Sequence, residues 1–195
     1  MKTLKFISTY KLVVKKSRFI GFAYPINNEE DAKNRIKELQ SKFFDARHIV
    51  YAYKIGDSII KKENSSEPAG TAGTPILCAI ENCELTNVLV VVVRYFGGVL
   101  LGASNLYKAY MDTAVNTINQ NEIITLSKYI IYKVKLSYVD YAVVNSLANK
   151  LDDVKVLDGD FGVEIIINIG IKEKTNNQFL LDLIKGKDSI GELWL

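Results

Sequence analysis

The stretch VLVVVVRYFGGVLLG (88–102) determines the fold of this chain. Residues 86–95 form an almost continuous β-branched run, which predicts a strand buried on both faces. Three glycines follow, and Ser104 or Asn105 is placed to cap a helix over 104–118, where apolar residues recur at helical spacing. A buried strand followed by glycines and a helix indicates a mixed α+β fold.

The residues upstream add further strands and helices. We expect strands at 6–14 and 17–25, a helix at 29–43 capped by Asn27 or Asn28, and a strand at 47–55. Residues 56–73 are polar and predict a long loop. Thr74 and Pro75 are the residue types that begin helices. The order expected for residues 1–120 is therefore β-β-α-β-α-β-α.

A second pattern begins after residue 120. We expect a strand at 127–138, a helix at 141–151, strands at 154–157 and 161–169, a helix at 177–184 and a strand at 190–195. This β-α-β-β-α-β order is typical of a ferredoxin-like domain. Residues 1–120 carry a net charge of +5 and residues 121–195 a net charge of −2. We therefore predict two domains, 1–120 and 121–195.

Composition narrows the class of protein. The 195 residues are 48% hydrophobic, which is enough for a core without a metal or a disulfide. Two cysteines and the single His48 do not supply a four-ligand zinc site, so we expect no metal and no cofactor. Lys5 and Lys11 interrupt the apolar start that a secretory signal needs, and no apolar run is long enough to span a membrane. We expect a cytoplasmic protein, and the oligomeric state stays open.

Basic residues gather near the N-terminus. Six of them precede the first acidic residue, Glu29. Such a cluster favours an anionic partner, although lysines also protect sheet edges from pairing. The candidates for nucleic-acid contact are Lys11, Lys15, Lys16, Arg18 and Lys108.

The glycine loop itself is a candidate anion site. Gly97, Gly98 and Gly102 allow close backbone approach, and a helix N-terminus presents free amides. The spacing G-x4-G-x-S is close to that of a nucleotide-binding loop, but Ala103 replaces the lysine that contacts the phosphates, so nucleotide hydrolysis is not expected. Alternatively, the glycines only permit a tight turn.

Arg94 ends the apolar strand beside this loop. It is structural if Glu67 or Asp45 neutralises it, and free to bind phosphate or carboxylate if neither does. We expect Arg94→Ala to weaken ligand binding more than stability. The loop EPAGTAGT (67–74) has the composition of an anion-binding nest. His48 has no identifiable nucleophile beside it, so catalysis is not expected.

Four motifs together resemble the IMPACT family, and specifically its bacterial YigZ-type members. They are DARH (45–48), EPAGTAGTP (67–75), VVVRYFGGVLLG (91–102) and LYKAY (106–110). The resemblance implies a first domain similar to the second domain of ribosomal protein S five, and a second domain similar to the last domain of elongation factor G. Both similarities point toward RNA and translation. The site residues expected from the motifs are Arg47, His48, Glu67, Gly70, Thr71, Gly73, Arg94, Gly97, Gly98, Gly102 and Ser104.

The eukaryotic members of that family restrain a starvation-responsive kinase and carry an additional RWD domain. This sequence shows no such domain, so that role is not expected here. We expect a non-catalytic protein that binds RNA or ribosome-associated factors, with a role in regulating translation. The alternatives are an enzyme or sensor for a phosphorylated metabolite or nucleotide, and a protein–protein adaptor.

Overall fold

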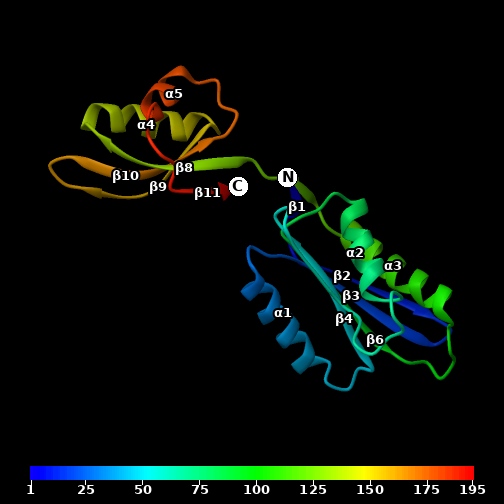
Figure 1. Cartoon of the computed structure of the whole chain (residues 1–195). Coiled ribbons are helices and arrows are strands. Elements are labelled where there is room, and N and C mark those ends of the chain that lie inside the picture. The colour runs from blue at the N-terminus through cyan, green and yellow to red at the C-terminus, as the bar shows by residue number, and fades with distance from the viewer. The chain divides into compact units, whose positions relative to one another are not determined.

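A computed structural model describes residues 1–195, which divide into two compact units, Met1–Thr125 and Leu126–Leu195. Figure 1 shows both units. The elements of the first unit are β1 (Lys2–Leu4), β2 (Ser8–Val14), β3 (Ser17–Pro25), α1 (Glu29–Lys42), β4 (His48–Ile55), β5 (Ile59–Glu63), α2 (Gly73–Asn82), β6 (Val88–Tyr95), α3 (Ala103–Asn119) and β7 (Ile123–Thr125).

The first unit is a five-stranded antiparallel sheet between two layers of helix. Its strand order is β2-β3-β6-β4-β5, so the β-branched strand β6 lies at the centre. Helix α1 covers one face, and α2 and α3 cover the other (Figure 1). A strand covered on both faces needs no polar side chains, which explains the continuous apolar run of β6.

Alternate residues of β6 build two separate cores. Val90 and Val92 pack toward α2 and α3, whereas Val91 and Val93 pack toward α1. Arg94 continues the first series and therefore points to the α2 and α3 face. A charged residue is thereby placed at the edge of a hydrophobic core.

The expected loop 56–73 contains a strand that the sequence did not reveal. Strand β5 pairs with β4 along its whole length, from Ile55↔Ile59 to Tyr51↔Glu63. All five of its residues are exposed, so its sequence shows no apolar alternation. Backbone pairing with β4, rather than side-chain burial, makes this segment a strand.

The starts of α2 and α3 also differ from expectation. Helix α2 begins at Gly73, whose amide donates to the Asn64 side chain at 2.7 Å, so Thr74 is not its cap. Helix α3 follows Gly102 at a φ of 79°, and no side chain caps it. Neither Ser104 nor Asn105 caps α3, and the Asn105 amide instead donates to the Leu101 carbonyl.

The second unit has the order expected of a ferredoxin-like domain. Its elements are β8 (Lys128–Leu136), α4 (Tyr138–Lys150), β9 (Val154–Phe161), β10 (Ile165–Lys172), α5 (Gln178–Ile184) and β11 (Gly191–Trp194). The antiparallel sheet runs β11-β8-β10-β9. Val144 of α4 and Leu180 of α5 pack on the same core of isoleucines from β10.

The α+β fold class is confirmed, and both predicted element orders are present with added short strands. The division between the units falls after Thr125 rather than after residue 120, because β7 pairs with β1. None of the helices combines the length and the apolar character needed to cross a membrane.

Candidate functional site

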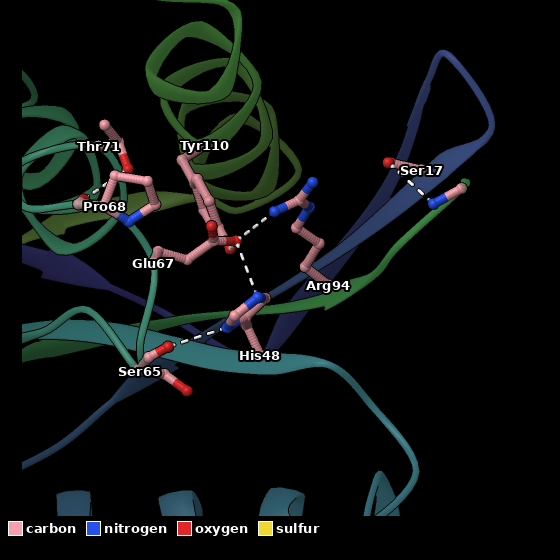
Figure 2. A network of polar contacts seen from close by, with 9 residues as sticks. Ser17, His48, Ser65, Glu67, Pro68, Thr71, Arg94 and Tyr110 are labelled. Carbon is pink, nitrogen blue, oxygen red and sulfur yellow. Dashed lines mark hydrogen bonds and ion pairs between the residues drawn. The ribbon is translucent and has the colours of Figure 1, made fainter. Parts of the chain in front are cut away.

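Four segments distant in sequence meet at one end of the sheet. His48 begins β4 and lies opposite Arg94 of β6 in the antiparallel register. Both belong to the face that α2 and α3 cover. Glu67, from the loop between β5 and α2, lies over them, and Tyr110 of α3 lies above Glu67 (Figure 2). The fold thus brings together one residue from each predicted motif.

Glu67 is the centre of a buried polar network. Its Oε1 atom accepts a hydrogen bond from Arg94 Nη1 at 2.6 Å and another from the Tyr110 hydroxyl at 2.7 Å. The same oxygen lies 3.7 Å from His48 Nε2. The side chains of Glu67 and Arg94 are only 2% and 7% exposed. Arg94 is therefore neutralised by Glu67, one of the two partners that the sequence offered, whereas Asp45 accepts from Tyr95.

Burial also fixes the state of Tyr110. Loss of hydration, reinforced by the nearby Glu67 carboxylate, raises the pKa of the Tyr110 hydroxyl well above its ordinary value. The hydroxyl therefore keeps its proton and remains a donor to Glu67.

The arginine is not fully satisfied by this network. The Nε atom of Arg94 is buried and has no hydrogen-bond partner. A buried donor without a partner costs free energy, and such groups are frequently found at functional sites. Arg94 therefore has both a structural bond and an unused donor.

The imidazole of His48 has a defined orientation. Its Nδ1 atom lies 2.9 Å from the carbonyl oxygen of Ser65 (Figure 2). A carbonyl only accepts, so Nδ1 carries the hydrogen and donates it. In the neutral ring, Nε2 is then an acceptor, and it faces Glu67.

A cavity of about 600 Å³ opens against this network. Four polar or charged residues line it, namely Arg47, His48, Glu67 and Arg94. The rest of its wall is apolar or glycine, from Pro68, Phe96, Leu100, Leu101, Gly102, Ala103 and Leu106. The cavity suits a ligand with one apolar part and one anionic part.

Two features favour an anion at the open side. Arg47 is exposed, and its guanidinium forms no hydrogen bond or ion pair. Gly102 and Ala103 lie at the start of α3, where no side chain caps the free amides. Free amides and a helix N-terminus both attract negative charge.

Several predicted residues have other surroundings and do not line this cavity. The Thr71 hydroxyl donates to the Pro68 carbonyl, and Gly73 contacts Asn64. Four other predicted site residues also do not line the cavity, namely Gly70, Gly97, Gly98 and Ser104. Of the predicted glycines, Gly102 is the one that lines this cavity, and an anion site at the others stays a prediction.

Gly97 instead joins the cavity loop to the β2–β3 hairpin. A Cβ atom at Gly97 would lie 2.1 Å from the carbonyl carbon of Lys16, so no other residue fits without a shift. The Gly97 amide also donates to the Ser17 hydroxyl at 3.1 Å. The turn of the hairpin is therefore held against the loop that supplies Phe96 and Leu100.

That hairpin carries most of the predicted nucleic-acid contacts. Lys11 of β2, Lys15 and Lys16 of the turn, and Arg18 of β3 are all exposed. The guanidinium of Arg18 lies 4.6 Å from the centre of the Tyr95 ring. Lys108 is exposed on α3. We call Lys11, Lys15, Lys16 and Arg18 the basic hairpin.

The apolar wall was missed in the sequence. Leu100 is 83% exposed and Phe96 is 48% exposed, although both are large apolar residues. Large apolar residues beside glycines in a connection between strand and helix are the signal that identifies such a wall.

Comparison with known proteins agrees with the motifs. The model of the Impact N-terminal domain matches residues 15–118, more than half of the chain and the whole of the site. The chain belongs to the IMPACT family. It is 29% identical to the IMPACT family member YvyE of Bacillus subtilis (strain 168), over 97% of this chain and 89% of that protein.

The family likeness extends beyond the first unit. The IMPACT family member YigZ of Escherichia coli (strain K12) is 28% identical over 81% of this chain and 79% of its own length, which confirms the YigZ-type resemblance. A crystal structure described as that of a hypothetical protein superposes with a TM-score of 0.69 and 25% identity, covering 100% of this chain and 95% of the other. The match with this crystal structure therefore covers both units.

Proposed function

We propose that this IMPACT family member is a non-catalytic protein that binds single-stranded RNA, free or on the ribosome, and thereby regulates translation. The observation that carries the proposal is the cavity beside the basic hairpin, which is lined by the exposed Arg47 and by apolar groups.

The groups that line the cavity match the chemistry of one nucleotide, which has an apolar base and an anionic phosphate. Proteins bind single-stranded RNA by placing bases against aromatic and apolar side chains and phosphates against basic ones. Phe96 and Leu100 supply an exposed apolar surface, and Arg47 supplies a guanidinium without a partner. A base on the wall and a phosphate near Arg47 would satisfy both.

The basic hairpin extends the cationic surface past the cavity. Gly97 holds the turn of the basic hairpin against the cavity loop. We infer that the lysines of this turn bind the phosphates next to a nucleotide in the cavity. Phosphate contacts of this kind supply affinity without reading sequence.

Translation as the process is supported by family resemblance. The resemblance implies a first domain similar to one from ribosomal protein S five and a second similar to one from elongation factor G, and both favour a ribosomal setting. The ferredoxin-like order of the second unit agrees with the latter.

Filter binding of a single-stranded RNA at several salt concentrations tests the proposal. For single strands, each phosphate contact adds about 0.7 to the slope of log affinity against log salt. We expect Arg47→Ala to lower the affinity and to reduce this slope by about 0.7. The matched control is Arg35→Ala, because Arg35 lies on α1 and pairs at the surface with Glu38. Absence of binding at low salt, or an equal effect of Arg35→Ala, would contradict the proposal.

The volume of the cavity favours a second candidate, a phosphorylated small molecule. A volume of about 600 Å³ lies within the range of small-molecule sites. Thermal-shift screening of nucleotides and sugar phosphates separates the two. A single compound that raises the melting temperature, with no effect of RNA, would favour the small molecule.

A further inference from the structure

The donors and acceptors on the cavity wall are unevenly divided. Arg47 and Arg94 carry donors only, as all arginines do. Among the side chains that line the cavity, the acceptors are His48 and Glu67, and they lie together. The acceptors His48 and Glu67 lie beside the buried donor Arg94, whereas the donor Arg47 is exposed.

In the neutral tautomer that donates from Nδ1 to Ser65, His48 Nε2 carries no hydrogen and faces Glu67 Oε1. The Ser65 carbonyl holds the hydrogen of the neutral imidazole on Nδ1, so Nε2 presents a lone pair to Glu67 Oε1 at 3.7 Å. Two lone pairs at this distance repel, and a single donor placed against both would relieve the repulsion. Oε1 already accepts from Arg94 and Tyr110, so the free acceptor sites of the carboxylate are those of Oε2, which accepts no hydrogen bond within the chain.

If the occupant of the cavity is a nucleotide, a hydroxyl group of its ribose can donate the hydrogen that His48 and Glu67 lack. A hydroxyl group donates one hydrogen and is compact enough for the closed end of a cavity. In RNA the ribose lies between base and phosphate, and its 2′-hydroxyl is the donor that DNA lacks. Carboxylates also bind ribose hydroxyls in dinucleotide sites.

We infer that His48 Nε2 and Glu67 form an acceptor pair that binds a ribose 2′-hydroxyl, so that the cavity selects RNA over DNA. This inference rests on the proposed function, because it requires a nucleotide in the cavity. It assigns His48 a role in specificity, and it explains why an acceptor is kept beside a buried carboxylate.

Fluorescence anisotropy of the full chain with three labelled oligonucleotides tests the inference. The oligonucleotides are a 12-residue RNA containing only A and C, the DNA of the same sequence, and its 2′-O-methyl RNA. The A and C sequence avoids the difference between uracil and thymine. We expect the RNA to bind about tenfold more tightly than the DNA, and the methylated RNA to bind like the DNA because it has no hydrogen to donate.

Variants of the protein test whether His48 causes the difference between RNA and DNA affinity. His48→Phe keeps a planar ring but removes the Nε2 acceptor, so the ratio of RNA to DNA affinity should fall toward one. Arg35→Ala is the control and should leave that ratio unchanged, since Arg35 lies on α1. If His48→Phe fails to fold, single 2′-deoxy substitutions along the RNA give the same information with the unaltered protein. One position should then account for most of the tenfold difference.

The outcomes separate the two proposals. Equal, salt-dependent binding of RNA and DNA would overturn the inference and leave the proposed function intact. An unchanged ratio in folded His48→Phe would overturn the role of His48. Binding of neither RNA nor DNA would overturn the proposed function and the inference with it.

Discussion

Arg94 and Glu67 carry opposite charges at a place that water hardly reaches. Their side chains are 7% and 2% exposed, and a 2.6 Å hydrogen bond joins them. Removing one member of a buried pair leaves the other without compensation, and this loss exceeds the net contribution of the intact pair. The pair therefore stabilises the wall of the cavity. This differs from the expectation that Arg94→Ala weakens ligand binding more than it lowers stability.

Arg94→Ala should lower the free energy of unfolding by about 3–5 kcal/mol, because Glu67 would remain buried without its guanidinium. Urea denaturation followed by circular dichroism measures the loss. Arg35→Ala serves as the comparison, since its ion pair with Glu38 is exposed and is expected to contribute below about 1 kcal/mol. If Arg94→Ala lowered the free energy of unfolding as little as Arg35→Ala does, Arg94 would have no structural role and would act on a ligand alone.

The charged half of the site was predictable from sequence, and the apolar half was not. A lone arginine after an apolar run and a lone glutamate in a glycine-rich loop stand out by residue type, and the structure joins Arg94 to Glu67. Leu100 and Phe96 lie in a connection where no helical or strand periodicity fixes the side-chain direction. The contribution of Leu100 and Phe96 to the cavity therefore could not be predicted from the sequence.

Strand β6, which the sequence predicts, and strand β5, which it does not, differ most in how far their side chains are buried. Strand β6 is buried at every position except its last residue, and its sequence is distinctive. Strand β5 is exposed throughout and exists through pairing with β4. Edge strands of this kind escape a search for apolar alternation, because their stability comes from the backbone of a neighbour.

The contact between the β2–β3 turn and the cavity loop depends on one glycine. Gly97→Ala would place a methyl group 2.1 Å from backbone atoms of Lys16, so the hairpin must move. We expect a loss of about 1–3 kcal/mol in the free energy of unfolding, typical of overpacking, together with weaker RNA binding. Urea denaturation and filter binding measure the two effects.

Gly162→Ala is the matched control for this change. A Cβ atom at Gly162 meets its nearest neighbour at 3.8 Å, an ordinary contact. We expect it to change stability by less than about 1 kcal/mol. If Gly97→Ala were as mild as Gly162→Ala, the hairpin would not be fixed to the cavity loop.

The two ends of the first unit pair with each other and close it. Strand β1 pairs with β7 from Lys2↔Thr125 to Leu4↔Ile123. Between these strands and the sheet, the Asn121 side chain accepts from the amides of Lys5 and Phe6. The predicted domain boundary at residue 120 rested on a change in net charge along the sequence. Net charge does not show which strands pair, so the β1–β7 pairing could not be predicted from it.

A fragment of residues 1–125 should therefore fold cooperatively, whereas a fragment of residues 1–120 should be less stable by about 2 kcal/mol or more. The shorter fragment loses the β1–β7 ladder and the bond from the Lys5 amide to the Glu122 carbonyl, and each such hydrogen bond contributes about 1 kcal/mol. Urea denaturation of both fragments, followed by circular dichroism, measures the difference. RNA binding by residues 1–125 alone would further assign the site to this unit. Equal midpoints for the two fragments would show that β7 contributes nothing to closure, and the unit would then end with α3.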